Sequence, residues 1–130
     1  MTSMQTAVLY AGLFCLFMLL LKVNVGRVRT KHKVGFGDGG HDEMQRSLRV
    51  QGNAVEDVPV VLVGLIGLGA LSAPALLIHG LGGSFLIGRI LHAFGLGGSS
   101  GSSFGRSTGT LITAVVMLVT AGSCAWYALT

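Results

Sequence analysis

The feature that most constrains this chain is a series of four long apolar stretches, each able to form a membrane-crossing helix. They cover about residues 7–25, 42–73, 75–94 and 107–129. A helix needs about 20 predominantly apolar residues to cross the hydrocarbon core of a bilayer. The second stretch is polar on one face through its first half and apolar throughout from Val58. With 51% hydrophobic and only 11% charged residues, the sequence predicts an all-α membrane protein, a four-transmembrane-helix bundle that forms a single domain over residues 1–130.

The first stretch has a cleaved signal peptide as its alternative interpretation. No basic residue precedes it, and the charges from Lys22 to Lys33 follow it, which is the wrong side for a signal peptide. A retained span is therefore predicted. Cys15 and Cys124 lie inside apolar stretches without metal-ligand spacing, so we interpret both as buried small hydrophobic residues. No metal site is predicted, and no basic patch interleaved with aromatic residues suggests nucleic acid.

The distribution of basic residues predicts the orientation in the membrane. Seven of the nine Lys and Arg residues lie between Lys22 and Arg49, and the other two, Arg89 and Arg106, flank the third connection. Basic residues favour the cytoplasmic side, so we expect the first and third connections there and both termini outside the cytoplasm. The run from Arg27 to Lys33 is interpreted mainly as a topology determinant that contacts anionic membrane lipids.

A polar face begins the second helix. Arg46, Arg49, Asn53 and Glu56 follow at spacings of three and four residues, which places them within a wedge of roughly 80°. Charged side chains at the start of a membrane span are costly unless they have partners. One interpretation is a polar clasp between helices, and the other is a ligand site.

The chemistry of this face suits a small zwitterionic peptide. Arginine binds carboxylates bidentately, Glu56 could hold an ammonium group, and Asn53 could pair with a peptide amide. Glutathione, with two carboxylates, one amine and a thiol, is such a molecule. A nearby positive charge lowers the pKa of a thiol and so favours the nucleophilic thiolate. Arg89, His92 and Arg106 are expected at the same membrane face.

Three blocks of sequence resemble the MAPEG family, the membrane-associated proteins of eicosanoid and glutathione metabolism. The pattern R-x-Q-x-N-x-x-E-x-x-P, from Arg49 to Pro59, is similar to the start of the second span of leukotriene-type synthases. The block from Arg89 to His92 resembles the end of the third span in a prostaglandin synthase of the family. Arg106-Ser107 resembles the opening of the fourth span. The glycine-rich turn before the second helix is similar to the small bacterial branch.

The resemblance implies a homotrimer in the bacterial inner membrane, with glutathione sites between subunits near the cytoplasmic face. It implies a glutathione transferase or peroxidase acting on lipophilic electrophiles or hydroperoxides, in which Arg106 stabilises the thiolate. The residues that it implies for glutathione binding are Arg29, Arg46, Arg49, Gln51, Asn53, Glu56, Arg89 and His92. Arg29 is included because an arginine occupies the matching helix end in the synthases.

Two departures from the family pattern concern the ligand. Asp57 stands where the leukotriene synthase has tyrosine, and Leu96 stands where both eicosanoid synthases have tyrosine. Two hydroxyl donors are therefore missing, and Asp57 adds a negative charge beside the predicted site. The alternative to an enzyme is a non-catalytic MAPEG-like protein that binds or scaffolds membrane partners. A proton-coupled exporter is disfavoured because the first span carries no carboxylate.

Overall fold

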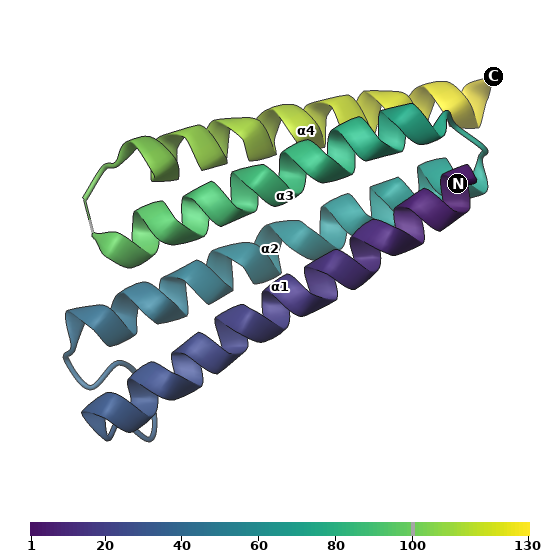
Figure 1. Ribbon diagram of the computed structural model, residues 1–130. Coiled ribbons are helices and arrows are strands. Elements are labelled where there is room, and N and C mark those ends of the chain that lie inside the picture. Colours follow the sequence, from purple (N-terminus) through teal and green to yellow (C-terminus); the bar gives the residue numbers. More distant parts are fainter. Residues whose placement is uncertain (100) are drawn as a thin grey trace.

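The computed structural model describes residues 1–99 and 101–130, which form four antiparallel helices (Figure 1). These are α1 (Ser3–His32), α2 (Asp42–Ala70), α3 (Ala75–Gly98) and α4 (Phe104–Leu129). All four are long and apolar enough to cross a membrane, which confirms the predicted four-helix transmembrane bundle. Both termini and the α2–α3 turn lie at one end of the bundle, and the α1–α2 and α3–α4 connections lie at the other.

Local sequence signals explain where the helices begin and end. Thr2 and Gln5 form a reciprocal capping box at the start of α1, which satisfies two of the backbone donors that a helix N-terminus leaves free. α1 ends where Lys33 adopts a left-handed conformation, with φ of 56°. At α4, the Ser103 hydroxyl accepts a hydrogen bond from the Arg106 backbone N–H, as a Ser N-cap does.

The end of α3 differs from the sequence prediction. The third apolar stretch is expected to end at about residue 94, before a glycine- and serine-rich segment at residues 95–103 that predicts a loop. Instead, α3 continues to Gly98; residue 100 lies outside the described part of the chain. Tertiary packing explains the difference. A Cβ on Gly95 would lie 2.3 Å from the Arg106 backbone nitrogen, and one on Gly105 would lie 2.9 Å from the Leu91 carbonyl oxygen. Because these glycines let the two backbones touch, the helical conformation is retained at residues that are poor helix formers.

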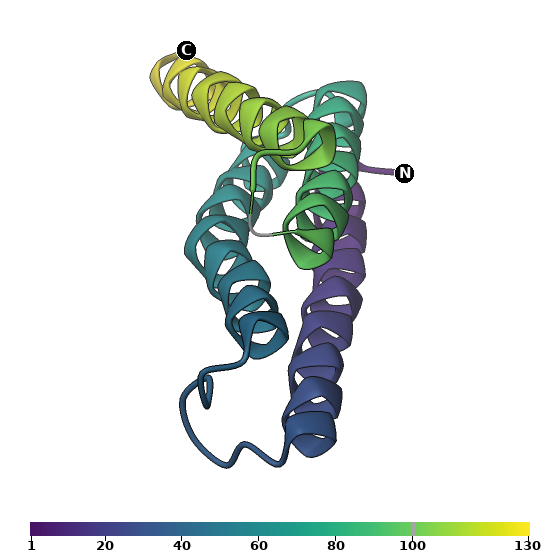
Figure 2. The same cartoon turned by 90° about the vertical axis from the view of Figure 1, so that its left-hand side faces the viewer.

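The helices pack as two pairs, α1 with α2 and α3 with α4, joined mainly through α2 and α3. Figure 2 shows α4 on the far side of α3 from α1, and within the described residues these two helices make no contact. The interior is filled by fully buried apolar side chains that include Phe14, Leu65, Leu68 and Phe85. Of the four helices, α4 has the smallest buried share in its most apolar segment, so most of its surface is left for lipid or for another chain.

Near the termini, a tyrosine links α1 to the start of α3. The Tyr10 hydroxyl lies 3.2 Å from both the carbonyl oxygen and the Nδ1 atom of His79. A Cβ on Gly82 would come within 2.5 Å of the tyrosine ring, so the ring occupies the space that this glycine leaves. The prediction that both cysteines are buried is wrong for Cys15, which is exposed. Its position on the outer face of α1 would place it against lipid.

Candidate functional site

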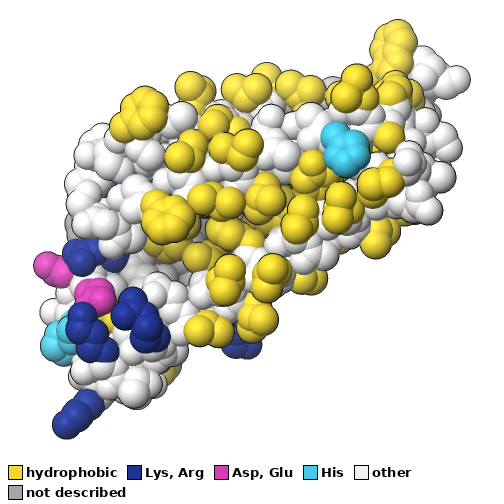
Figure 3. All heavy atoms as spheres, viewed as in Figure 1, with side chains coloured by type: hydrophobic (Ala, Val, Ile, Leu, Met, Phe, Trp, Pro, Cys, Tyr) yellow, Lys and Arg dark blue, Asp and Glu magenta, His cyan; other side chains and the backbone are white. Residues whose placement is uncertain are grey.

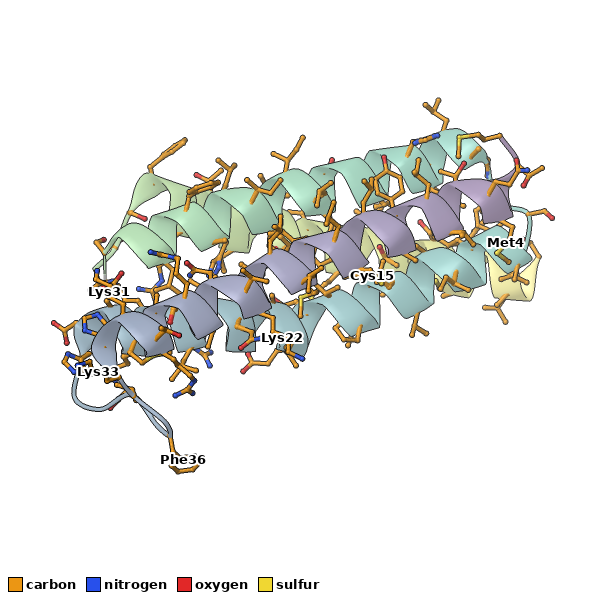
Figure 4. The ribbon with its side chains drawn as sticks, turned by 60° about the horizontal axis from the view of Figure 1, so that its bottom comes forward. Met4, Cys15, Lys22, Lys31, Lys33 and Phe36 are labelled. Atoms are coloured by element: carbon orange, nitrogen blue, oxygen red, sulfur yellow. The ribbon has the colours of Figure 1, made fainter. Side chains whose placement is uncertain are left out.

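The charged side chains gather at the end of the bundle opposite the termini. Figure 3 shows most of the Lys, Arg, Asp and Glu side chains of this face at that end, with one Lys or Arg nearer the middle, beside a surface that is otherwise largely hydrophobic. Figure 4 shows the progression along α1, from Met4 and Cys15 to Lys22, Lys31 and Lys33. Phe36 lies at the tip of the following loop. A charged end and an apolar body are what a membrane-spanning bundle with one cationic face should show.

At this end Arg89 is the centre of a buried polar cluster formed with Asn53, Asp57, His92 and Thr113. Its Nη1 atom donates to Asp57 Oδ2 at 2.7 Å and to Thr113 Oγ1 at 3.4 Å. Its Nη2 atom donates to Asn53 Oδ1 and, at 3.0 Å, to His92 Nδ1. Arg89 is only 1% exposed. A buried guanidinium is tolerated only where an anion and further acceptors surround it, and this cluster supplies both.

Helical spacing and close helix packing assemble the buried cluster. Asn53 and Asp57 are four residues apart on α2, and Arg89 and His92 are three apart on α3, so each pair shares a helix face. Thr113 comes from α4, whose approach depends on Gly109. A Cβ at Gly109 would lie 2.4 Å from the Gly88 carbonyl oxygen and 2.7 Å from the His92 backbone nitrogen. The missing side chain therefore brings α4 close enough for the threonine to reach Arg89.

The hydrogen bonds also fix the protonation pattern of the histidine. Arginine has donors and no acceptor, so His92 Nδ1 must accept the hydrogen bond from Arg89. A neutral His92 then carries its proton on Nε2. His92 is 4% exposed. Its Nε2 atom is therefore the ring nitrogen that can donate a hydrogen bond.

A second polar group on α2 faces outward. Arg49 Nη1 lies 3.2 Å from Glu56 Oε1, and the two side chains are 58% and 57% exposed. We call this the exposed pair. Arg46, one turn earlier, is half-buried. Because Glu56 and Asp57 are adjacent, their side chains point about 100° apart around the helix, one to the outside and one into the bundle.

Arg106 stands at the first turn of α4 and is half-buried. Its backbone is held by Ser103, and its Nη1 atom donates to the Gly101 carbonyl oxygen at 3.4 Å. Arg49, Arg89 and Arg106 all lie near enough to His92 to act on it electrostatically. The structure thus brings together residues from α2, α3 and α4 that the sequence placed in one site.

Two predicted residues lie elsewhere within the chain. Arg29 donates from Nη1 to the Gly37 carbonyl oxygen at 2.9 Å. Arg29 is thus bound by the α1–α2 loop, next to the C-terminal end of α1. It does not join the cluster. Gln51 is two residues from both Arg49 and Asn53, which turns it about 200° away from each. Gln51 is half-buried, and its role in glutathione binding stays a prediction.

The sequence missed the roles of Asp57 and Thr113. Asp57 was expected to add a negative charge beside the site, but the structure pairs that charge with Arg89. The signal was present, since a carboxylate four residues after Asn53 on a membrane helix needs a cationic partner. Nothing in the sequence marks Thr113, because its hydroxyl also donates to the Gly109 carbonyl oxygen at 2.8 Å, as threonine in a helix commonly does. Leu96, which replaces a tyrosine of the synthases, is 5% exposed.

Comparison with known proteins settles the family. The model of the MAPEG family matches residues 7–126, which is nearly the whole chain and includes every residue of the cluster and of the exposed pair. The chain belongs to the MAPEG family. It is similar to the inner membrane protein YecN of Escherichia coli (strain K12), with 35% identity over 91 residues, 70% of each chain. A protein of Synechocystis sp. is 36% identical over 95 residues, 72% of this chain and 69% of its own length.

The comparisons identify the family but not an activity. The MAPEG family includes glutathione transferases and peroxidases, whereas the names of the bacterial relatives give a membrane location or no activity. The chain is therefore a MAPEG membrane protein with an inner-membrane relative.

Proposed function

We propose that this MAPEG protein is a glutathione transferase or peroxidase that acts on lipophilic electrophiles. The observation that carries the proposal is the solvent-exposed Arg49–Glu56 pair, which lies on the motif that resembles the family's glutathione motif. Arg49 and Arg106 both act electrostatically on His92. This group offers cations for the two carboxylates of glutathione and an anion for its ammonium group.

The exposed pair is available to a ligand because opening it costs little. An ion pair between side chains that are more than half exposed contributes roughly 0–1 kcal/mol. Glutathione could therefore displace Arg49 from Glu56 and give each a new partner, with Arg49 binding a carboxylate and Glu56 the ammonium. Arg46 and Arg106 would supply further positive charge. The buried cluster cannot open so readily, because Arg89 would lose its counter-ion away from water.

In the proposed reaction, Arg106 lowers the pKa of the glutathione thiol and stabilises the thiolate. In transfer to an aryl halide, the thiolate sulfur bonds to the electrophilic carbon and the halide ion leaves. In reduction of a hydroperoxide, two glutathione molecules are oxidised to the disulfide while the hydroperoxide becomes an alcohol and water. His92 would use its Nε2–H to donate a hydrogen bond to the ligand.

Several features of the family belong to this proposal. We propose a homotrimer in the bacterial inner membrane, with glutathione bound between subunits near the cytoplasmic face and both termini on the other side. Arg29 and Gln51, which lie away from the cluster in one chain, would then reach glutathione only from a neighbouring subunit. The exposed surface of α4 leaves room for such a neighbour.

The test uses purified protein in detergent with glutathione and a generic aryl halide or hydroperoxide. We expect ultraviolet absorbance from bound glutathione thiolate and turnover of at least one acceptor. Arg106→Ala should abolish the thiolate signal. Lys22→Ala removes one positive charge from an exposed position on α1 and should leave the signal unchanged.

The enzyme proposal fails if the wild-type protein forms no thiolate and transfers glutathione to no acceptor. A second candidate function, a non-catalytic binding or scaffold protein of the membrane, would then be favoured. The observation behind it is that Asn53 and Arg89 already bind each other, which removes two of the contacts expected for glutathione.

A further inference from the structure

A groove between α1 and α3 points to a binding site that is separate from the proposed glutathione site. We propose that it holds the acyl chain of a membrane lipid whose anionic headgroup binds at Arg27. The groove has a volume of about 670 Å³. Leu13, Leu16 and Leu20 of α1 and Leu86, Ile90 and Ala93 of α3 line it.

The length of the groove matches one leaflet of a bilayer. From Leu13 to Asn24, the lining residues of α1 advance eleven positions, or roughly 16 Å at about 1.5 Å per residue. This is about half of a hydrocarbon core of roughly 30 Å. A lipid of the leaflet at the charged end would therefore fill the groove with one acyl chain and place its headgroup beside the polar rim.

The polar rim is suited to an anion. Asn24, Arg27, Glu43 and Ser47 line this end of the groove. Arg27 donates from Nη2 to Asn24 Oδ1 at 3.0 Å and, within residues 1–99 and 101–130, forms no ion pair. Glu43 already forms an ion pair with Lys31 at 2.7 Å and lies 2.8 Å from His32 Nε2. Ser47 is buried, and its hydroxyl donates to the Met44 carbonyl oxygen at 3.0 Å. The rim therefore presents the unneutralised guanidinium of Arg27, a group that binds phosphate oxygens.

Position separates this groove from the glutathione site. Ser47 and Val50 of the buried face of α2 lie at its base, and Glu56 is nine positions from Ser47, which turns it about 180° to the other side of the helix. A larger groove between α3 and α4, of about 980 Å³, has no charged residue in its lining. Of these two grooves in the described part of the chain, the α1–α3 groove is the one that combines an apolar length with a cationic end, so a charged amphiphile fits it better.

Native mass spectrometry of the full chain tests the proposal. Protein in detergent would be incubated with phosphatidylglycerol or with phosphatidylcholine of the same acyl chains, and the detergent would be removed in the mass spectrometer. We expect one tightly retained lipid per chain and about fivefold preference for phosphatidylglycerol, the usual contribution of one basic residue at an anionic membrane surface. Arg27→Gln should remove this preference, while Lys22→Gln, which deletes the same charge from an exposed position of the same helix outside the groove, should keep it.

A second pair of variants tests the apolar part of the groove. Ala93→Trp fills the groove and should lower retention of both lipids, whereas Ala114→Trp, at an exposed position of α4 outside it, should not. Arg27 is exposed, so its variant is expected to fold even if Ala93→Trp does not.

Four results would overturn the proposal. They are equal retention of the two lipids by the wild type, equal losses in the Arg27 and Lys22 variants, undiminished lipid retention by Ala93→Trp, and loss of oligomers without loss of lipid in Ala93→Trp. The last result would identify the groove as an interface between copies of the chain.

Discussion

Glu56 and Asp57 are neighbours in the sequence, yet they belong to two different regions of the molecule. Glu56 lies on the outer face of α2, more than half exposed, and pairs with Arg49 of its own helix. Asp57 points into the bundle and pairs with Arg89 of α3, which is 2% exposed at its side chain. The same chemistry, a carboxylate with an arginine, thus occurs once as a link within a helix and once as a link between helices.

The difference teaches which polar groups hold the fold and which are free for a ligand. The buried cluster joins three helices through one guanidinium, so removing any member leaves another buried polar group without its partner. The exposed pair joins no second helix, and its loss costs the fold little. The polar face that the sequence predicts as one unit is therefore divided into a structural part and an exposed part, and we propose that the exposed part binds the ligand.

The largest expected effect comes from removing the carboxylate that pairs with the buried Arg89. Asp57→Ala leaves Arg89 buried without a counter-ion and should destabilise the protein by about 3–5 kcal/mol. Glu56→Ala is the matched control one residue away and should cost less than about 1 kcal/mol. Thermal unfolding of both variants in the same detergent measures the difference. Equal losses would break the division of α2 into two regions.

A double variant sharpens the same comparison. Asp57→Leu combined with Arg89→Met replaces the buried ions by apolar side chains of similar length, an exchange that is often neutral in other proteins. We expect it to recover a large part of the stability that Asp57→Ala loses. If the double variant unfolds as readily as Asp57→Ala, the destabilisation does not come from the unpaired charge of Arg89.

A smaller effect, on binding and not on folding, is expected at the outer face. Arg49→Gln removes a charged hydrogen-bond donor worth roughly 1.5–3 kcal/mol to a carboxylate ligand, which corresponds to about tenfold to hundredfold weaker glutathione binding. The unfolding temperature should stay close to that of the wild type. Isothermal titration calorimetry measures glutathione binding, and thermal unfolding of the same sample measures stability. Lys22→Gln serves as the control for loss of charge.

The packing of α4 gives the smallest and most local test. Gly109→Ala would place a methyl group against the Gly88 carbonyl oxygen and the His92 backbone, and overpacking of this kind typically costs about 1–3 kcal/mol. Gly122→Ala, on the same helix with nothing within 4 Å of the added carbon, should not destabilise the protein. If both changes lower the unfolding temperature equally, the effect belongs to the whole helix. Gly109 would then have no special role in bringing α4 to the buried cluster.

The sequence predicted the four spans and the helix faces that the polar residues share, because both follow from local periodicity. Arg49, Asn53 and Glu56 could be placed on one face of α2 by counting residues, and Arg89 and His92 on one face of α3. The pairing of Asp57 with Arg89 depends on how two helices are rotated against each other, which periodicity within one helix does not determine. The continuation of α3 through Gly95 likewise depends on the approach of α4, whereas local composition indicates a loop.

The central claim, that the outer face of α2 binds glutathione, is tested most directly by calorimetric titration of glutathione into the wild type and Glu56→Gln in detergent. Replacing the carboxylate by an amide of the same shape removes only the charge that would hold the ammonium group. We predict measurable binding by the wild type and about tenfold or greater weakening in the variant, with unchanged unfolding temperature. Binding of glutathione by Glu56→Gln as tight as that by the wild type, or no binding by either protein, would contradict the claim.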